Sequence, residues 1–236
     1  MSLLATRGLS KHFGGLDAVS DVDFTLETGR IRALIGPNGA GKTTLVGMLC
    51  GRIDPTAGQV LFHDQDITSL PAHKRIGAGM AYTFQITSVF IHLSVLENVA
   101  LAARSKWPRA EEVERRARDA LEQVGLADRA GQLAGDLAYG HQRLLEIAMG
   151  LVQEPVLLIM DEPTQGLSDA EIETFKALVR DVASNATVLL IEHNMSVVME
   201  LADRITVLNF GRILAEGTPA EVHENLEVQA AYLGTS

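Results

Sequence analysis

The residues best suited to chemistry are 36–44, which read Gly-Pro-Asn-Gly-Ala-Gly-Lys-Thr-Thr. The first eight fit the pattern G-x-x-x-x-G-K-[ST], whose glycines let the backbone fold tightly and aim several N–H groups at one anion. In such a loop Lys42 could reach the β- and γ-phosphates of a nucleotide, and the Thr43 hydroxyl could hold Mg²⁺. We therefore expect a phosphate-binding loop made of Gly36, Pro37, Asn38, Gly39, Ala40, Gly41, Lys42, Thr43 and Thr44.

This loop needs a strand before it and a helix after it. Residues 31–35 are apolar enough for a short buried strand, and Leu45, Met48, Leu49 and Ile53 recur at helical spacing. The helix would begin at the loop and place its unpaired N–H groups and positive dipole end near the anion. The alternative is a glycine-rich turn that binds nothing, and the agreement of loop, strand and helix argues against it.

A second group of polar residues follows the apolar run 156–160, Val-Leu-Leu-Ile-Met, which is typical of a central strand in a parallel sheet. Asp161 and Glu162 come directly after this run, where open α/β sheets place their ligands. Asp161 could hold Mg²⁺, and Glu162 could orient or deprotonate a water that attacks the γ-phosphate. The alternative is an acidic pair that caps the next helix.

Three single residues are weaker candidates. His193 follows the predicted strand 187–191 and is either structural or a hydrogen-bond donor to the γ-phosphate. Gln85 follows the predicted strand 80–84 and could contact Mg²⁺ and the attacking water. Phe13 precedes a Gly-Gly pair, so its ring could stack on a nucleobase or pack within the turn.

Residues 137–143, Leu-Ala-Tyr-Gly-His-Gln-Arg, lead into a predicted helix with apolar residues Leu144, Ile147, Ala148 and Leu151. A turn of small residues at a helix N-terminus is another potential anion site. It belongs to a different part of the chain from the first loop. Two half-sites for one phosphate group suggest that they meet between two chains in a head-to-tail, two-fold dimer.

The order of predicted elements indicates an α/β fold with a mainly parallel sheet. Residues 3–35 are rich in strands, and residues 86–153 form a helical, more charged insertion. Within that insertion, Ser94 and Glu97 form a capping box at the start of a helix that ends near Ala103. The other predicted elements are strands at 3–9, 22–26, 58–62 and 204–208, a turn at 64–66, and helices at 71–75, 109–124, 172–182 and from 195.

Composition limits the class of protein further. The chain has 236 residues, 47% of them hydrophobic, and a formal net charge of −10, which argues against a broad basic face for nucleic acid. Its one cysteine, Cys50, allows no internal disulfide, which suits a reducing compartment. We expect no secretory signal and no membrane span, because no apolar run approaches the ~20 residues that a span needs.

Together these segments resemble those of an ATP-binding cassette (ABC) ATPase. Residues 36–44 resemble Walker A, Gln85 the Q-loop, 137–141 the LSGGQ signature, 156–162 Walker B, 165–168 the D-loop and His193 the switch histidine. The resemblance implies a P-loop NTPase core with an N-terminal antiparallel part and an inserted helical subdomain. It also implies that Phe13 stacks on the adenine of ATP, that Thr43, Gln85 and Asp161 hold Mg²⁺, and that Glu162, His193 and Gln85 act in hydrolysis. The residues implied to contact ATP of a second subunit are Leu137, Ala138, Tyr139, Gly140 and His141.

Finer features resemble the ATPases of branched-chain amino-acid importers. These are Lys-His-Phe-Gly-Gly at 11–15, Tyr-Thr-Phe-Gln at 82–85, Leu-Ala-Tyr-Gly at 137–140, Leu-Leu-Glu-Ile-Ala at 144–148 and the tail 218–234. Such importers carry two different ATPases, and Thr-Phe-Gln favours the kind that has this glutamine. Related systems move urea, amides or aromatic acids, and a lipopolysaccharide exporter has a similar ATPase.

The resemblance also implies partners and a domain plan. We expect a second ABC ATPase subunit in a homo- or heterodimer, integral membrane permeases, an indirect solute-binding protein and no nucleic acid. The chain would then lie in the cytoplasm, on the inner face of the membrane. We expect 1–236 to be one domain, with a nucleotide-binding core at 1–85 and 154–217, a helical signature subdomain at 86–153 and a C-terminal extension at 218–236.

Three positions depart from the family pattern. Ala138 replaces the signature serine, His141 replaces its glutamine, and Ser168 stands where the D-loop usually ends in aspartate or asparagine. These changes affect the half-site that this chain would give to the ATP of the second subunit, not its own phosphate loop. The main alternative is a non-transport ABC protein of DNA repair or translation, although such proteins usually carry a long coiled-coil arm or two cassettes. A small-molecule kinase would leave residues 137–143 without a role.

Overall fold

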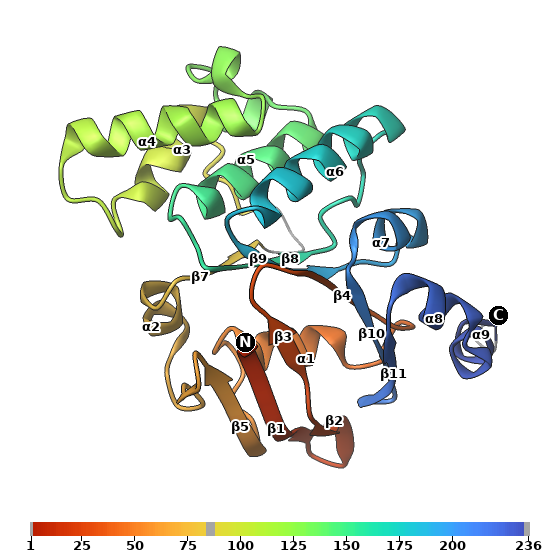
Figure 1. The fold of residues 1–236 in the computed structure, drawn as a ribbon. Coiled ribbons are helices and arrows are strands. Elements are labelled where there is room, and N and C mark those ends of the chain that lie inside the picture. The colour runs from red at the N-terminus through yellow and green to blue at the C-terminus, as the bar shows by residue number, and fades with distance from the viewer. Residues whose placement is uncertain (1, 84–87, 234–236) are drawn as a thin grey trace.

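The structure is a computed structural model that describes residues 2–83 and 88–233 (Figure 1). Its centre is a six-stranded sheet in the order β11-β10-β4-β9-β8-β7. Neighbouring strands are parallel except for β10 and β11, which form an antiparallel hairpin. The strands are β4 (Ile31–Ile35), β7 (Met80–Thr83), β8 (Leu157–Asp161), β9 (Thr187–Ile191), β10 (Arg204–Asn209) and β11 (Arg212–Gly217).

A second, antiparallel sheet is built from the N-terminal part of the chain. Its long strand β1 pairs with β2, β3 and β5, and β5 pairs with β6. Its strands are β1 (Ser2–Phe13), β2 (Leu16–Val22), β3 (Thr25–Glu27), β5 (Ala57–Phe62) and β6 (Gln65–Asp66). Helix α1 (Lys42–Leu49) packs between the two sheets, because Leu45 and Met48 share one core cluster with Leu4 and Leu189.

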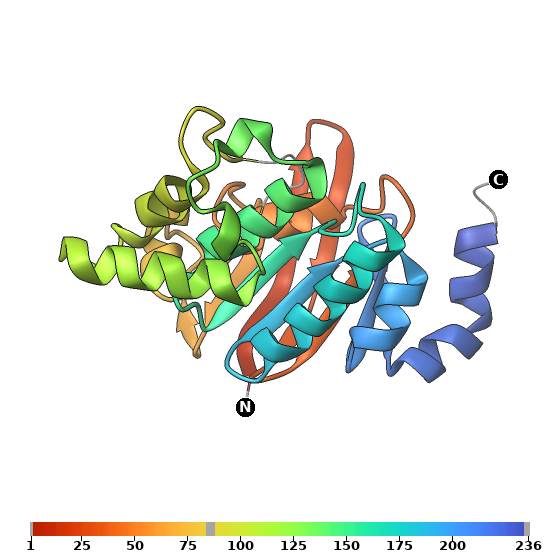
Figure 2. The ribbon, with the colours of Figure 1, turned by 90° about the horizontal axis from the view of Figure 1, so that it is seen from above.

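Helices cover the opposite face of the central sheet. Between β7 and β8 lie α3 (Val95–Ala103), α4 (Ala110–Gln123) and α5 (Tyr139–Leu151), with 3₁₀ turns at Ala127–Arg129 and Ala134–Asp136. These helices and α6 (Asp169–Ala183) bury one continuous cluster against β8 and β9. The remaining helices are α2 (Ala72–Gly77), α7 (Met195–Leu201), α8 (Pro219–Glu224) and α9 (Leu226–Leu233). Figure 2 shows α3 and α4 at one end of the molecule and α8 and α9 at the other.

The predicted fold class is confirmed, and several elements match the sequence pattern closely. The strands 31–35 and 187–191 have the predicted bounds. The capping box at Ser94 is present, since its side chain accepts from the Glu97 N–H while Glu97 accepts from the Ser94 N–H. Within the described residues, none of the helices combines the length and apolar character that crossing a bilayer requires.

Other predicted elements were wrong in detail. The single strand at 22–26 is interrupted, because the Thr6 hydroxyl donates to the Val22 carbonyl and accepts from the Phe24 N–H where the chain leaves β2 for β3. The predicted turn at 64–66 begins one residue earlier, since His63 and Asp64 have positive φ and close a two-residue hairpin.

Two further differences concern where elements end. Helix α1 stops before Ile53, because Gly51 takes a left-handed φ of 71° just beyond the helix. Strand β11 had no counterpart among the predicted elements. It forms because Phe210 and Gly211, both with positive φ, make the two-residue turn that folds it back onto β10.

The capping box gives a direct test of the fold. We expect Ser94→Ala to lower the free energy of unfolding by about 1 kcal/mol, because it removes the acceptor for an N–H of the first turn of α3. Urea unfolding would measure the change. The control is Ser69→Ala, in an exposed turn, which should alter stability by less than about 0.5 kcal/mol. Equal effects of the two substitutions would contradict the role of the cap.

Candidate functional site

The loop 36–44 joins the carboxyl end of β4 to the start of α1, as the sequence predicts. The Lys42 ammonium folds back over it and donates to the carbonyls of Gly36, at 2.6 Å, and Pro37, at 3.1 Å. Burial lowers the pKa of Lys42, while the charges of Glu162 and Asp161 act in the opposite direction. A partly desolvated ammonium held next to a turn of backbone N–H groups is suited to binding a phosphate.

Glycine is required at two places where other strands press on this loop. A Cβ on Gly36 would lie 2.1 Å from the Leu208 carbonyl oxygen, and one on Gly41 would lie 2.3 Å from that of Ala18. The N–H of Gly211 also donates to the Ala40 carbonyl, at 2.9 Å. The loop is therefore shaped by the ends of β2 and β10 as well as by its own sequence.

The loop presents part of its surface outward. Its exposed residues are Asn38, Gly39 and Thr43, the intermediate ones are Pro37, Gly41, Lys42 and Thr44, and the buried ones are Gly36 and Ala40. The Thr43 hydroxyl is thus accessible to an ion or ligand above the loop.

Asp161 ends strand β8 and is almost fully buried, with 3% of its surface exposed. The Tyr82 hydroxyl donates to its Oδ2 at 2.8 Å. Burial raises the pKa of Asp161, and the hydrogen bond from Tyr82 partly opposes that shift. Burial and the Asp161 charge together raise the pKa of Tyr82 well above its usual range, so this phenol remains a donor. Sequence reasoning gave Tyr82 no role, because only the pairing of β7 with β8 brings it to Asp161.

Glu162 and His193 meet at the carboxyl ends of adjacent strands. The Glu162 Oε1 lies 3.8 Å from His193 Nδ1, and the glutamate N–H donates to the Ile191 carbonyl at 2.8 Å. Glu162 has a φ of 49°, which is uncommon outside glycine, at the point where the chain leaves β8. The acidic pair does not cap the next helix, since Ser168 caps α6.

Two buried charged residues that sequence reasoning missed support this edge. The Arg143 guanidinium, on α5, donates to the Glu162 carbonyl at 3.4 Å and to Glu146 at 2.9 Å. Glu192, next to His193, is only 1% exposed. Its position before the histidine was visible in the sequence, but its burial was not.

The magnesium ligands predicted from the sequence fit the donor chemistry of that ion. Thr43 and Asp161 offer oxygen atoms, and Mg²⁺ is usually held by one or two protein oxygens together with waters and substrate phosphates. Among the described residues, no group of three or more His, Cys, Asp or Glu side chains could hold a metal without such a substrate. The third predicted ligand, Gln85, lies outside the described residues.

The segment 137–141 opens helix α5. Ala138 is its N-cap residue and makes no side-chain cap, so the first backbone N–H groups of the helix lack that acceptor. Tyr139 is 42% exposed. The segment packs near the loop after β8, since a Cβ on Gly166 would come within 2.8 Å of the Tyr139 ring and one on Gly140 within 2.3 Å of Glu171.

Phe13 ends β1 at the tip of the hairpin with β2. Its side chain is 48% exposed, and the Lys11 ammonium lies 5.1 Å from the ring centroid. An aromatic ring that is half exposed offers a face to a planar ligand.

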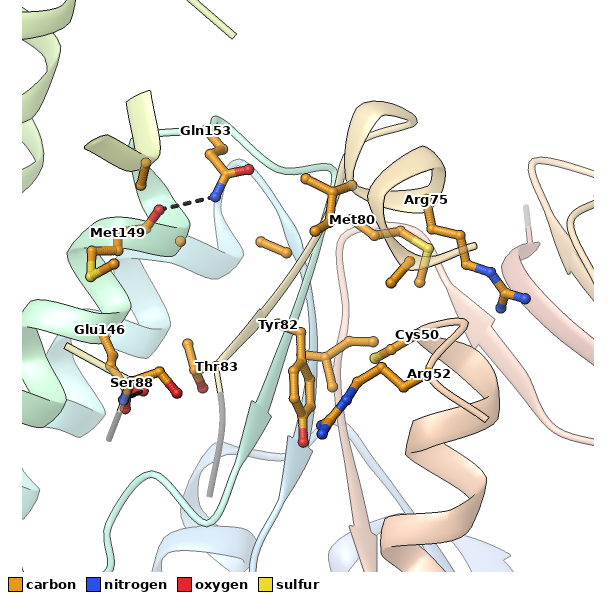
Figure 3. Close-up of a pocket in the computed structure, with 16 residues that line it drawn as sticks. Cys50, Arg52, Arg75, Met80, Tyr82, Thr83, Ser88, Glu146, Met149 and Gln153 are labelled. Carbon is orange, nitrogen blue, oxygen red and sulfur yellow. Dashed lines mark hydrogen bonds between the residues drawn. The ribbon is translucent and has the colours of Figure 1, made fainter. Parts of the chain in front are cut away.

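A cavity of about 240 Å³ opens between α2 and β7 on one side and α5 on the other (Figure 3). Cys50, Arg75 and Tyr82 line it from one side, and Glu146, Met149 and Gln153 from the other. Burial raises the pKa of the Cys50 thiol to about 12, so this cysteine is a packing residue at the cavity wall.

Comparisons with known proteins agree with this geometry. A family profile described as ABC transporter matches residues 19–165, more than half of the chain. The chain belongs to the ABC transporter family. A second profile, described as branched-chain amino acid ATP-binding cassette transporter, matches residues 212–236 and places this ABC ATPase in the branched-chain amino acid type.

Curated relatives align along the whole chain. BraF of Pseudomonas aeruginosa, a high-affinity branched-chain amino acid transport ATP-binding protein, is 41% identical and covers 98% of both chains. LivG of Escherichia coli K12, with the same description, is 40% identical over 98% of both. LptB of Escherichia coli K12, a lipopolysaccharide export system ATP-binding protein, is 32% identical over 99% of this chain and 98% of its own.

Solved structures of ABC cassettes share the fold. A nucleotide-free ATP-binding cassette superimposes with a TM-score of 0.90 at 29% identity, covering 98% of this chain and 99% of its own. The ADP conformation of the cassette MJ1267 has a TM-score of 0.90 at 30% identity and covers 99% of both chains. The predicted family and ATPase class are therefore confirmed.

The close contacts of the phosphate loop lead to a stability prediction. Gly39→Ala should cost about 1–2 kcal/mol, because its φ is 79° but its Cβ would meet open space. Gly41→Ala should cost more, because the added methyl would also overlap the Ala18 carbonyl. Urea unfolding of the nucleotide-free variants tests this difference, and equal losses would show that the strand contact does not matter.

The raised pKa of Asp161 predicts a pH effect. The folded protein holds this proton more tightly than the unfolded chain does, so the ionised carboxylate costs stability above the raised pKa. That cost fades as the pH falls through the raised pKa to the ordinary one. We therefore expect Asp161→Asn to stabilise the nucleotide-free protein at neutral pH and to lose this advantage in acid.

Urea unfolding across a pH series measures that difference. The control is Asp119→Asn, whose carboxylate is 60% exposed on α4 and should give little pH-dependent gain. An advantage of Asp161→Asn that grows toward low pH would contradict the expected sign of the effect.

Proposed function

We propose that this ABC ATPase hydrolyses ATP to drive the import of branched-chain or related amino acids. The solute class is inferred from the match of residues 212–236 to the branched-chain amino acid profile. The whole-chain similarity to BraF and LivG, whose names state this transport, supports it. The proposal extends to urea and amides, because other subunits select the solute. Within the pair of ATPases, we assign the chain to the kind that has Thr-Phe-Gln, which this sequence carries at 83–85.

In the proposed site, ATP lies on the loop 36–44 with its adenine on the Phe13 ring. The backbone N–H groups of the loop and the start of α1 bind the phosphates. Lys42, which now donates to two loop carbonyls, exchanges them for β- and γ-phosphate oxygens. Thr43, Gln85 and Asp161 would hold Mg²⁺, which would neutralise phosphate charge when bound.

Hydrolysis is assigned to the edge formed by β8 and β9. Glu162 orients or deprotonates the attacking water, and Gln85 takes part in positioning it. His193 donates a hydrogen bond to the γ-phosphate and lies close enough to Glu162 to act on the same group. Tyr82 holds the Asp161 carboxylate in place from the neighbouring strand.

We further propose that residues 137–141 complete the ATP site of a second ABC ATPase subunit. Five residues form this half-site: Leu137, Ala138, Tyr139, Gly140 and His141. Ala138 has no hydroxyl to offer the γ-phosphate, so the uncapped backbone N–H groups at the start of α5 supply the donors there. Closure of two subunits around ATP, and their opening after hydrolysis, would be the motion that drives transport.

The membrane partners are proposed to be permeases that bind at the cavity in Figure 3. Both parts of the chain line it, so a permease segment seated there would respond to their relative movement. Ser88, three residues after Gln85, is also in the lining. This arrangement would hold the ATPase at the cytoplasmic face of the membrane, with a solute-binding protein acting through the permeases. The division into core, 86–153 helical subdomain and 218–236 extension is part of this proposal.

Two alternatives have less support. The lipopolysaccharide-export relative LptB is 32% identical, against 40–41% for LivG and BraF. A DNA-repair or translation role does not suit a chain with a net charge of −10 and a compact block of α3, α4 and α5 between β7 and β8.

The proposal is tested by Glu162→Gln. We expect ATP binding to persist while hydrolysis by the full chain, and transport after assembly with permeases, fall by about 10²–10³, because the group that activates the water is lost. Steady-state ATPase assays and uptake of labelled leucine by vesicles would measure this. The control is Glu114→Gln, an exposed side chain on α4, which should leave both activities unchanged. Wild-type hydrolysis by Glu162→Gln would refute the assignment.

A further inference from the structure

Glu192 is a buried carboxylate that joins two loops of the site. It directly follows β9 and is 1% exposed. Its Oε1 accepts from the Thr164 N–H at 2.9 Å and from the Thr164 hydroxyl at 2.5 Å. Its Oε2 accepts from the N–H groups of His193, at 3.0 Å, and Asn194, at 3.2 Å. Each oxygen therefore serves a different loop.

These two loops carry the residues proposed to act on the γ-phosphate. Thr164 lies two residues after Glu162, in the loop that leaves β8. The loop that leaves β9 begins with Glu192 and His193. The Glu192 side chain thus bonds to the backbone of both loops. Glu162 and His193, one on each loop, lie 3.8 Å apart between Oε1 and Nδ1.

The chemistry of the link favours a carboxylate over other side chains. All four groups directed at Glu192 are N–H or O–H donors, and an ionised carboxylate has two acceptor oxygens and no donor. An amide of the same shape would direct its NH₂ group at one pair of these donors. A buried donor left without an acceptor destabilises the protein by more than the net contribution of the hydrogen bond that is lost.

We propose that Glu192 is a positioning residue, which holds His193 and Glu162 in register by bonding the loops after β8 and β9 to each other. This inference rests on the function proposed above for Glu162 and His193. Glu192 does not touch the nucleotide in this scheme, and it acts through His193.

The first test compares Glu192→Gln with the wild-type full chain. We expect kcat for ATP hydrolysis to fall about ten- to a hundredfold, as for other partners that orient an active-site group. KM and the affinity for a fluorescent ATP analogue should change less than about threefold, since the phosphate loop is untouched. Wild-type kcat, or an equal loss in binding and turnover, would overturn the proposal.

The second test separates positioning from general support of the fold. In a His193→Ala background, Glu192→Gln should lower kcat by less than about twofold, because without the imidazole there is no register between His193 and Glu162 left for Glu192 to hold. A full additional loss in that background would show that Glu192 acts independently of His193. If His193→Ala and Glu162→Gln themselves keep wild-type hydrolysis, the proposed function fails; if they lose it and Glu192→Gln does not, only the present inference fails.

Thr164 provides a matched pair if Glu192→Gln does not fold. Thr164→Val removes the hydroxyl donor with little change in shape, and Thr164→Ser keeps it. We expect kcat to fall about three- to tenfold in Thr164→Val and to stay near the wild-type value in Thr164→Ser. The loss should again disappear in the His193→Ala background, and equal kcat in the two Thr164 variants would overturn the proposal.

Discussion

Close contact between the phosphate loop and the backbones of its neighbours is the constraint on which the site depends. The carbonyls of Leu208 and Ala18 occupy the space that side chains on Gly36 and Gly41 would need. Gly211 then donates to the Ala40 carbonyl from the β10–β11 turn. Two distant parts of the chain, β2 and the β10–β11 hairpin, therefore hold the loop in its shape.

One cationic and two acidic side chains lie at the carboxyl edge of the central sheet, beside this loop. The Lys42 ammonium interacts with the charges of Glu162 and Asp161, and burial works against its charge and that of Asp161 alike. Such a pair is stabilised when a polyanion and a divalent cation enter together, because the phosphate compensates the ammonium and the metal ion compensates the carboxylate. This arrangement of charge supports the proposed binding of ATP together with Mg²⁺.

The helical block is coupled to this edge by buried polar contacts instead of by apolar packing alone. Arg143 reaches from α5 to the Glu162 carbonyl, and its partner Glu146 accepts from the Ser88 N–H at 2.7 Å. Removing one member of a buried ion pair leaves the other charge without compensation, so these contacts favour a fixed relation between the helical block and the loop that carries Glu162. The same glutamate lines the cavity proposed for the permease, which links that surface to the loop that carries Glu162.

The sequence alone determined the family, the loop 36–44 between a strand and a helix, and the buried strands β4 and β9. These features are local: glycine spacing sets the loop, and continuous apolar runs mark buried parallel strands such as β9. Sequence periodicity could not place β11 or divide β2 from β3, because turns with positive φ and one threonine hydroxyl decide them. Tertiary structure alone brought Tyr82 to Asp161 and buried Glu192 between two loops, because those contacts join residues far apart in the chain, and their partners are set by strand order and register.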